Sequence, residues 1–314
     1  MVATRMSLSI PPSVLALFTS IFVCLSGCQV EQTTKKPTTD RSAQRELPSL
    51  ERQFACLPAE SAIIAAHRGN SRNMGLAENV MPSLKALYEG GILMAEIDVA
   101  GLKDGTHILF HDGVWEEDTT GRGVVAATTW AQASSYLLRD DQGKLTSSVP
   151  ARLDEALAFA KGKMYLEIDF KSSAKYDHVI SQIKNAGLEN HVILIAYNDK
   201  QVRALRELAP DMMISASVRS LSDIEKYNKM GLTTKRLNAW MGTLTDDLPL
   251  AQALSDKGIT VLAMGQRQLN ELAGPAHVLV SDYALSDKSA GPYPGIIGLN
   301  KDNLSDYEAC LSET

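Results

Sequence analysis

The stretches LMAEIDV (residues 93–99) and KMYLEIDFK (residues 163–171) decide the fold prediction, because both alternate apolar and charged residues. In a β-strand, side chains two residues apart share one face, so each run turns its charged residues to the same side. The residues concerned are Glu96 and Asp98 on the first strand, and Glu167, Asp169 and Lys171 on the second. Carboxylates that face a common interior are costly to bury unless cations compensate, and an oxygen-ligated Ca²⁺ or Mg²⁺ would suit them.

The two runs belong to a series of short apolar segments that alternate with amphipathic segments, which is typical of parallel βα units. We therefore predict an α/β fold, a TIM (β/α)8 barrel, with a doubly wound sheet as the alternative. The predicted strands are residues 62–66, 93–99, 163–169, 191–196, 212–217, 235–240, 259–264 and 278–281. The predicted helices are residues 80–89, 153–160, 176–185, 200–208, 222–229 and 248–256. The predicted caps are Asn79 and Asp199 at helix starts and Gly187, Gly231 and Gly258 at helix ends.

An extra apolar run, residues 107–110, interrupts the alternation after the second strand. It follows Asp104-Gly105, a dipeptide that favours a hairpin turn, so we expect the second strand to double back. The segment from about 113 to 150 is too long for an ordinary βα loop and predicts a small inserted subdomain or lid.

Two histidines are expected where the predicted barrel would carry its active site, at the C-terminal ends of the strands. His67 ends the first strand, and the hairpin leads to His111. A histidine at a strand end is more often structural than catalytic, but two of them beside an acidic metal site favour catalysis.

The N-terminus has the features of an export signal. A basic start precedes an almost uncharged apolar stretch, residues 8–25. The sequence LSGC (residues 25–28) resembles a bacterial lipobox, which implies removal of residues 1–27 and lipidation of Cys28. An uncleaved membrane anchor is the alternative. Residues 28–58 are polar and predict a flexible tether.

Residues 59–314 remain, and their number is close to the ~250 residues of one barrel, so we predict a single globular domain. The formal net charge of -6 and the pI near 5.6 argue against a nucleic-acid partner. Cys56 and Cys310 bracket this domain. In an exported protein they could form a disulfide, and two inert thiols are the alternative.

Several ordered pieces of the sequence carry a family signature. They are His67-Arg68-Gly69, Glu78-Asn79, Glu96-Ile97-Asp98 and His111-Asp112, followed by the segments 118–123, 149–155 and 280–283. Together they resemble the glycerophosphodiester phosphodiesterase family, over roughly residues 63–284. The resemblance implies a TIM barrel with a small insertion after the hairpin, and hydrolysis of glycerophosphodiesters to glycerol 3-phosphate and an alcohol.

The resemblance also implies roles for single residues. It makes His67 and His111 the general acid/base pair and Glu96 and Asp98 ligands of one divalent cation, Ca²⁺ or Mg²⁺. Arg68 would bind the phosphate, and Glu78 would stand beside the site as a ligand or a partner of a ligand.

The second acidic strand departs from the family pattern of a single Glu-x-Lys. Glu167 and Asp169 are therefore alternatives for the third metal ligand, and alignment on Lys171, a second phosphate-binding cation, favours Asp169. The family often has a Trp-Thr pair on its seventh strand, and residues 261–264 do not supply it. Trp240 could instead line the alcohol side of the substrate, or pack in the core.

Two other functions compete with this one. The first is a related phospholipase C/D-type phosphodiesterase that acts on intact phospholipid, and the second is a non-catalytic, lipid-anchored binding module. The expected location is the bacterial cell envelope, through a lipid anchor. Gln29, rather than aspartate, follows Cys28, which favours the outer membrane facing the periplasm.

Overall fold

A computed structural model describes residues 47–243, 247–265 and 273–313 of the chain. The predicted signal peptide, Cys28 and most of the predicted tether lie outside these residues. None of the helices in the described ranges is long and apolar enough to span a membrane.

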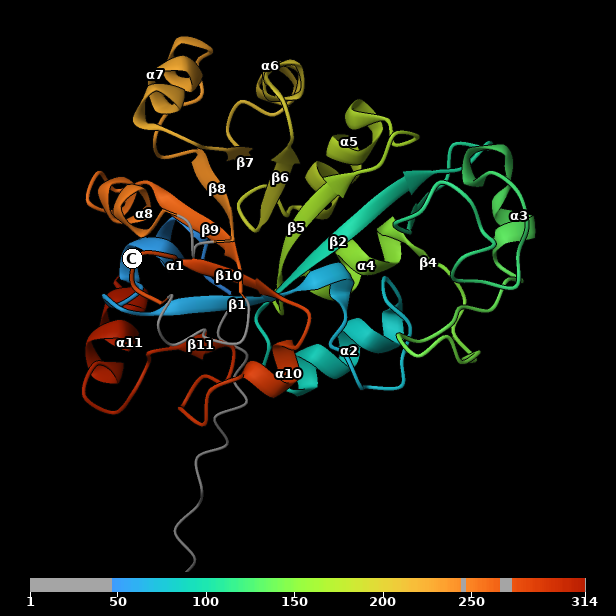
Figure 1. The fold of residues 1–314 in the computed structure, drawn as a ribbon, viewed down its shortest axis with the longest axis horizontal. Helices are drawn as coiled ribbons and strands as arrows, with labels where there is room; N and C mark the ends of the chain where they lie inside the picture. Colours follow the sequence, from blue (N-terminus) through green and yellow to red (C-terminus); the bar gives the residue numbers. More distant parts are fainter. Residues whose placement is uncertain (1–46, 244–246, 266–272, 314) are drawn as a thin grey trace, which may run out of the picture. The chain divides into compact units, whose positions relative to one another are not determined.

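A closed ring of parallel strands forms the centre of the fold (Figure 1). The eight strands, all within the described ranges, are β1 (Ala62–Ala66), β2 (Met94–Gly101), β5 (Tyr165–Phe170), β6 (Val192–Ala196), β7 (Met213–Ser217), β8 (Leu237–Thr243), β9 (Thr260–Met264) and β10 (Val278–Ser281). Each strand pairs with the next, and β1 pairs with both β10 and β2, which closes the ring. The predicted TIM barrel is thereby confirmed over the doubly wound sheet.

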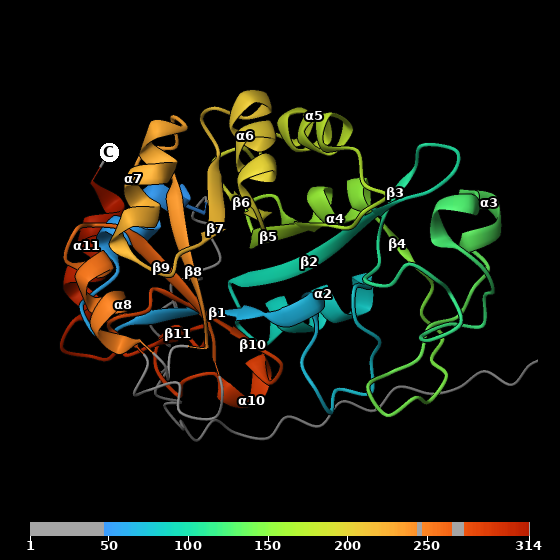
Figure 2. The ribbon, with the colours of Figure 1, turned by 45° about the horizontal axis from the view of Figure 1, so that its top comes forward.

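Helices pack on the outside of this ring, as Figure 2 shows for the side near β5 to β8. They are α2 (Met81–Glu89), α4 (Leu153–Ala160), α5 (Tyr176–Ala186), α6 (Asp199–Leu208), α7 (Leu221–Lys229), α8 (Leu248–Ser255) and α10 (Ala284–Asp287). Outward-facing strand residues such as Ile97 and Ile168 form an apolar layer with them. Because successive strand residues alternate in direction, the acidic residues between them face the inside of the barrel.

The second strand doubles back as predicted. β3 (His107–Leu109) pairs antiparallel with β2, and Gly105 supplies the left-handed backbone of the turn with φ 86°. The chain then leaves the barrel for an inserted subdomain and returns through β4 (Ala151–Arg152), which pairs with β3. The insertion contains the short helices η2 (Val125–Ala127) and α3 (Trp130–Ala133) and has its own apolar cluster around Trp115.

The N-terminal end of the barrel is covered by α1 (Leu50–Cys56) and α11 (Leu304–Ser312), which a disulfide between Cys56 and Cys310 joins. A two-residue strand, β11 (Ile296–Ile297), runs antiparallel to β1 nearby. The prediction of a flexible tether up to residue 58 is therefore wrong for its last part. Leu50 is buried, and its N–H bonds the carbonyl of Asn190 just before β6.

Two predicted helix caps are also corrected. Val80, not Asn79, precedes α2, because the Asn79 side chain bonds Asp98 instead. Asn198, not Asp199, caps α6, and its Oδ1 accepts a hydrogen bond from the Gln201 N–H. The three predicted glycines do follow their helices with left-handed φ values, 69° at Gly187, 84° at Gly231 and 70° at Gly258.

Candidate active site

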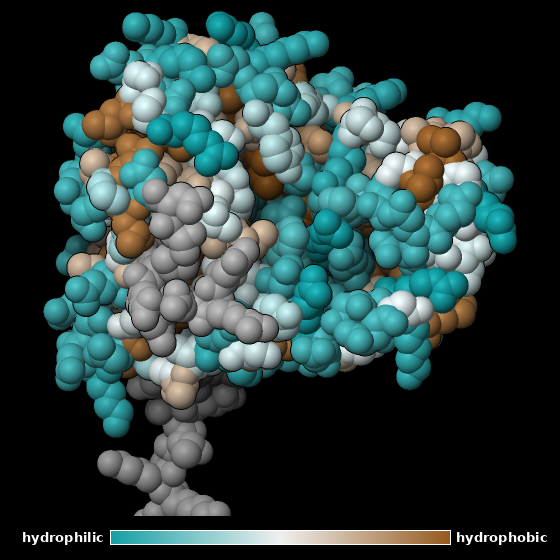
Figure 3. Space-filling model, in the orientation of Figure 1, coloured by the Kyte–Doolittle hydropathy of each residue, from teal (hydrophilic) through white to brown (hydrophobic). Residues whose placement is uncertain are grey.

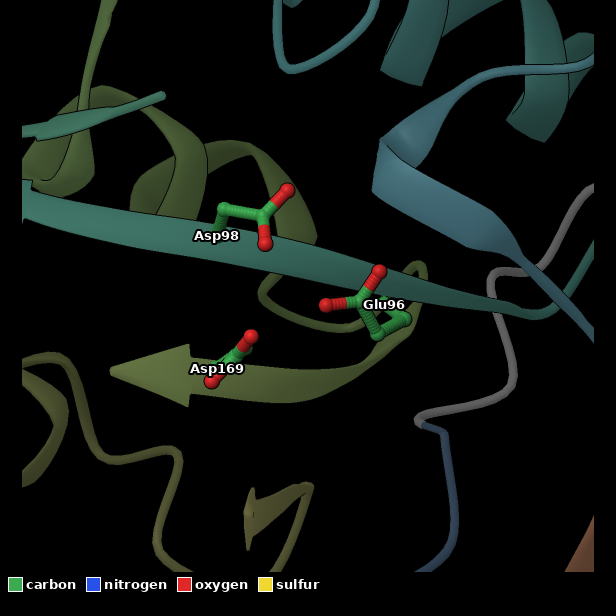
Figure 4. Close-up of side chains that lie close together, drawn as sticks. All are labelled: Glu96, Asp98 and Asp169. Carbon is green, nitrogen blue, oxygen red and sulfur yellow. The ribbon is translucent and has the colours of Figure 1, made fainter. Parts of the chain in front are cut away.

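Strand register brings three carboxylates together inside the C-terminal half of the barrel. In the parallel pair β2–β5, Glu96 is level with Glu167, and Asp98 with Asp169. One ligand oxygen each from Glu96, Asp98 and Asp169 lies within 4.8 Å of the others. Figure 4 shows the three carboxylates pointing into the same space from the two neighbouring strands.

Glu167 lies apart from this group and deeper in the barrel. It is 1% exposed and receives a hydrogen bond from the Ser215 hydroxyl. Burial raises the pKa of Glu167 to about 8, which keeps it protonated near neutrality. The geometry therefore groups Asp169, rather than Glu167, with the other two predicted ligands.

Lys171 forms ion pairs with two of the three carboxylates. Its Nζ lies 2.6 Å from Asp98 Oδ1 and 2.7 Å from Asp169 Oδ2. Burial opposes the charge of the ammonium group, but the two aspartates outweigh it and raise the pKa of Lys171. Asp169 Oδ2 also accepts a hydrogen bond from the Tyr197 hydroxyl at 2.7 Å.

The three carboxylates together are suited to bind a divalent cation. Glu96, Asp98 and Asp169 are all buried, and burial together with the charge of Asp98 raises the pKa of Glu96 well above its usual range. Asp169 Oδ1 is buried and has no hydrogen-bond partner among the residues that the structure describes. Hard carboxylate oxygens of this kind are the preferred ligands of Ca²⁺ and Mg²⁺.

Each of the two predicted catalytic histidines is paired with an aspartate. His67 Nδ1 lies 2.7 Å from Asp282 Oδ1, and His111 Nδ1 lies 2.7 Å from Asp112 Oδ1. The hydrogen bond from His67 lowers the pKa of Asp282. With Nδ1 engaged in this way, Nε2 is the ring nitrogen that each histidine has for proton transfer, and at His111 this atom accepts a hydrogen bond from Arg68.

Arg68 links His111 to two acidic side chains, Glu78 and Glu96. Its guanidinium donates to the Nε2 atom of His111 at 3.0 Å and to both oxygens of Glu78, at 3.1 and 3.3 Å. Its backbone N–H donates to Glu96 Oε2 at 2.8 Å. Arg68 has a left-handed backbone, with φ 53°, which turns the chain back over the carboxylates.

Both histidines, the carboxylates and Lys171 border a cavity of about 150 Å³ at the C-terminal ends of the strands. These residues form its polar side. The rest of the lining, from β6 to β10, combines the apolar residues Ile195, Ala196, Trp240, Met264 and Val280 with the hydroxyl-bearing residues Tyr197, Ser215 and Ser217. Trp240 lines the cavity and also packs against the apolar interior of the barrel, so both alternatives for it stay open. The molecular face in Figure 3 is mostly hydrophilic, with apolar patches at its upper left and smaller ones on its right-hand lobe.

Sequence reasoning missed three polar residues that support the site. Asp282 lies in the segment 280–283, but the sequence alone assigns it no role in the site. Its position directly after the last strand could have indicated one. Tyr197 likewise follows β6 directly. Asp118, in the insertion, shares a side-chain hydrogen bond with Asp112. No sequence spacing indicated this last contact.

Comparisons with known proteins agree with this geometry. The model of the glycerophosphoryl diester phosphodiesterase family matches residues 67–263, more than half of the chain. A curated glycerophosphodiester phosphodiesterase from Caldanaerobacter subterraneus subsp. tengcongensis is 28% identical over 159 residues, which cover 48% of this chain. The match spans 65% of the length of that relative.

Solved structures share the fold. A glycerophosphoryl diester phosphodiesterase from Parabacteroides distasonis has a TM-score of 0.65 at 22% identity and covers 74% of this chain and 88% of its own. A phosphodiesterase from Oleispira antarctica, solved with the product sn-glycerol-3-phosphate, has a TM-score of 0.59 at 19% identity and covers 74% of this chain and 96% of its own. These structural similarities show the fold. The family model also shows the family, because its match begins at His67 and includes both histidines and all three grouped carboxylates. The chain belongs to the glycerophosphoryl diester phosphodiesterase family.

Proposed function

We propose that this protein is a metal-dependent phosphodiesterase that hydrolyses glycerophosphodiesters to glycerol 3-phosphate and an alcohol. The observation that carries the proposal is the joint placement, around one cavity, of two histidine–aspartate pairs and a buried carboxylate triad. The product bound to the Oleispira antarctica phosphodiesterase supports the substrate class.

Charge stabilisation follows from the cationic groups of the site. A phosphodiester carries one negative charge, and more charge develops on its oxygens in the transition state. Arg68, held by Glu78, lies in a neighbouring pocket that also includes His67 and can donate hydrogen bonds to these oxygens, and Lys171 lines the cavity with both histidines. Glu96, Asp98 and Asp169 would hold a divalent cation, which supplies Lewis-acid stabilisation of the same charge when bound.

Proton transfer is assigned to the two histidines. Each donates Nδ1–H to its aspartate, so Nε2 is the atom that takes or gives a proton, at His111 once the Arg68 guanidinium turns from this nitrogen to the phosphate. One histidine removes the proton of the attacking hydroxyl or water, and the other protonates the leaving alkoxide.

The test is release of glycerol 3-phosphate from glycerophosphocholine by the full-length protein, before and after chelation and with Mg²⁺ or Ca²⁺ added back. We expect chelation to stop the reaction and one of the two ions to restore it. His67→Ala and His111→Ala should each lower kcat by roughly 10²- to 10⁴-fold. His178→Ala, an exposed histidine on α5, is the control. Full activity of either site variant would overturn the proposal.

One observation favours the alternative of an intact phospholipid substrate. Four exposed apolar residues lie at the end of the barrel where the cavity opens, after β6, β7, β8 and β10. They are Tyr197, Leu221, Leu248 and Tyr283. Comparison of phosphatidylcholine vesicles with glycerophosphocholine separates the two functions, and faster hydrolysis of the vesicles would establish the phospholipase. If neither is hydrolysed although the cation binds, the non-catalytic binding module remains.

We also propose that the protein is exported and anchored to the bacterial cell envelope through a lipid on Cys28, in the outer membrane facing the periplasm. The disulfide between Cys56 and Cys310 supports an oxidising compartment. Metabolic labelling with a palmitate analogue should mark the wild type and not Cys28→Ala. Equal labelling of both proteins would overturn the assignment.

A further inference from the structure

We propose that Asn79 is a positioning residue that fixes the Asp98 carboxylate for the divalent cation. The inference deepens the proposed function and rests on it. It gives a role to a residue that is 1% exposed and that, as the structure shows, does not cap the helix that follows it.

The Asn79 side chain pairs with Asp98 through both ends of its amide. Nδ2 donates to Asp98 Oδ2 at 2.7 Å, and Oδ1 accepts the backbone N–H of Asp98 at 3.0 Å. This leaves Asp98 Oδ1 directed toward the carboxylates of Glu96 and Asp169. Lys171 Nζ contacts the same oxygen at 2.6 Å. Asn79 therefore determines which oxygen of Asp98 can serve a cation.

The need for an amide follows from where β1 ends. β1 pairs with β2 only at Ala65 and Ala66, opposite Met94 and Ala95. Farther along β2, Asp98 lies beyond the end of β1 and next to Phe110, whose N–H donates to the Asp98 carbonyl. Without Asn79, the Asp98 N–H would be a buried donor with no other bond among the described residues, which is costly. The Asn79 side chain supplies a peptide-like acceptor there, and its donor end binds the carboxylate of the same residue.

The backbone at Asn79 is adapted to this task. Asn79 has φ 55° and donates its backbone N–H to the carbonyl of Arg68 at 2.7 Å, while Arg68 has φ 53°. Left-handed backbone is strained at non-glycine residues, and asparagine tolerates it better than most of them. Since the Arg68 N–H also bonds Glu96, this loop holds two of the three proposed ligands at once.

The test compares cation binding by metal-free full-length protein, measured by isothermal titration calorimetry with Mg²⁺ and Ca²⁺. Asn79→Gly keeps the left-handed backbone and removes the amide. Asn79→Asp keeps the shape and the acceptor but loses the donor. We expect both to weaken binding on the order of 10- to 100-fold, the usual effect of removing a partner of a metal ligand. Asn73→Gly, at an exposed left-handed asparagine of the same loop with φ 67°, should bind like the wild type.

Catalysis gives a second readout. Raising the cation concentration should restore most of kcat to the Asn79 variants, which a folding defect would not allow. If Asn79→Gly fails to fold, as judged by circular dichroism, Asn79→Asp decides. Wild-type affinity in the folded variants, or an equal loss in Asn73→Gly, overturns the inference. A wild type that binds the cation without hydrolysing any glycerophosphodiester overturns the proposed function alone, and one that binds no cation overturns both.

Discussion

At the scale of single residues, the two histidine–aspartate pairs differ in how far apart their members lie in the chain. Asp112 is the neighbour of His111, whereas Asp282 follows the last barrel strand and reaches His67 across 215 positions of sequence. Closure of the barrel between β1 and β10 is what makes this second contact, so His67 depends on the integrity of the whole ring.

Asp282→Asn should therefore impair catalysis without unfolding the protein. The asparagine amide can donate to His67 Nδ1 and hold the ring in the opposite tautomer, with its proton on Nε2. We expect kcat to fall by roughly 10²- to 10⁴-fold, as the loss of an orienting carboxylate does in the serine-protease triad. Asp302→Asn, at an exposed aspartate before α11, is the control. A kcat equal to that of the wild type would show that His67 needs no such partner.

A second residue-scale prediction concerns pH. Burial, the hydrogen bond with Asp112 and the charge of Glu78 raise the pKa of Asp118 from 3.8 to about 6. Folding therefore takes up a proton at Asp118 between about pH 4 and pH 6, and the stability of the fold decreases as pH rises through this window. An asparagine amide in its place would donate the same hydrogen bond without ionising, so Asp118→Asn should have a higher Tm than the wild type at pH 7 and an equal Tm at pH 4.

Thermal unfolding of both proteins at the two pH values measures this difference. Asp140→Asn, at another aspartate of the insertion, controls for the loss of one negative charge. Equal Tm values for wild type and Asp118→Asn at pH 7 would show that Asp118 ionises without penalty.

The residue scale also shows where sequence reasoning ends. Alternation within each strand was enough to place Glu96, Asp98, Glu167 and Asp169 inside the barrel. The register between β2 and β5 sets Glu167 level with Glu96 and Asp169 level with Asp98, and the hydrogen bond of Glu167 with Ser215 is what keeps its carboxyl group out of the triad. Register depends on long-range packing, so the sequence left these two residues as alternatives for the third ligand.

At the scale of elements, the insertion depends on one buried side chain. Trp115 is fully buried, donates from Nε1 to Thr128 Oγ1 at 2.8 Å and packs against Phe110 with ring centroids 4.7 Å apart. Phe110 directly precedes His111. The apolar cluster of the insertion therefore supports the backbone that carries the second histidine–aspartate pair.

Trp115→Ala should loosen the insertion while the barrel stays folded. Replacing a buried tryptophan by alanine costs about 3–5 kcal/mol, and this cluster is small and separate from the barrel core. We expect new protease cleavage within residues 113–150 and a lower kcat, measured by limited proteolysis with mass spectrometry and by the activity assay. Val124→Ala, at an exposed apolar position of the insertion, is the control. A cleavage pattern identical to that of the wild type would contradict the prediction.

Elements were predictable where local pattern decides them, and not where distant contacts do. The first and last barrel strands, residues 62–66 and 278–281, have the predicted bounds because apolar runs and their flanks define them. Asn79 was taken for a helix cap because a polar residue before a helix usually is one. The sequence predicts a tether up to residue 58 because the run 28–58 is polar as a whole, whereas the buried face of α1 within it depends on contacts with the barrel end and on the disulfide.

At the scale of the whole molecule, the disulfide closes the chain across 254 positions. Constraining so long a loop in the unfolded state should stabilise the protein by about 3–5 kcal/mol. The double variant Cys56→Ser/Cys310→Ser should thus unfold at lower urea concentration. It should keep its kcat, because the bond lies at the barrel end opposite the cavity. Urea titration followed by tryptophan fluorescence measures the change, and an unchanged midpoint would show that the bond contributes nothing to stability.

The point at which the described chain enters the barrel has a practical consequence. The Leu47 carbonyl accepts a hydrogen bond from His191 Nε2 at 2.9 Å, directly before β6, so the chain arrives at the closed end, while the cavity opens at the other end. If the protein is coupled to a bead through a tag ahead of Leu47, the cavity of each bound molecule should open toward the solution. Turnover per molecule should then decline little as the coating becomes denser, whereas coupling through the insertion would bring the openings against the bead.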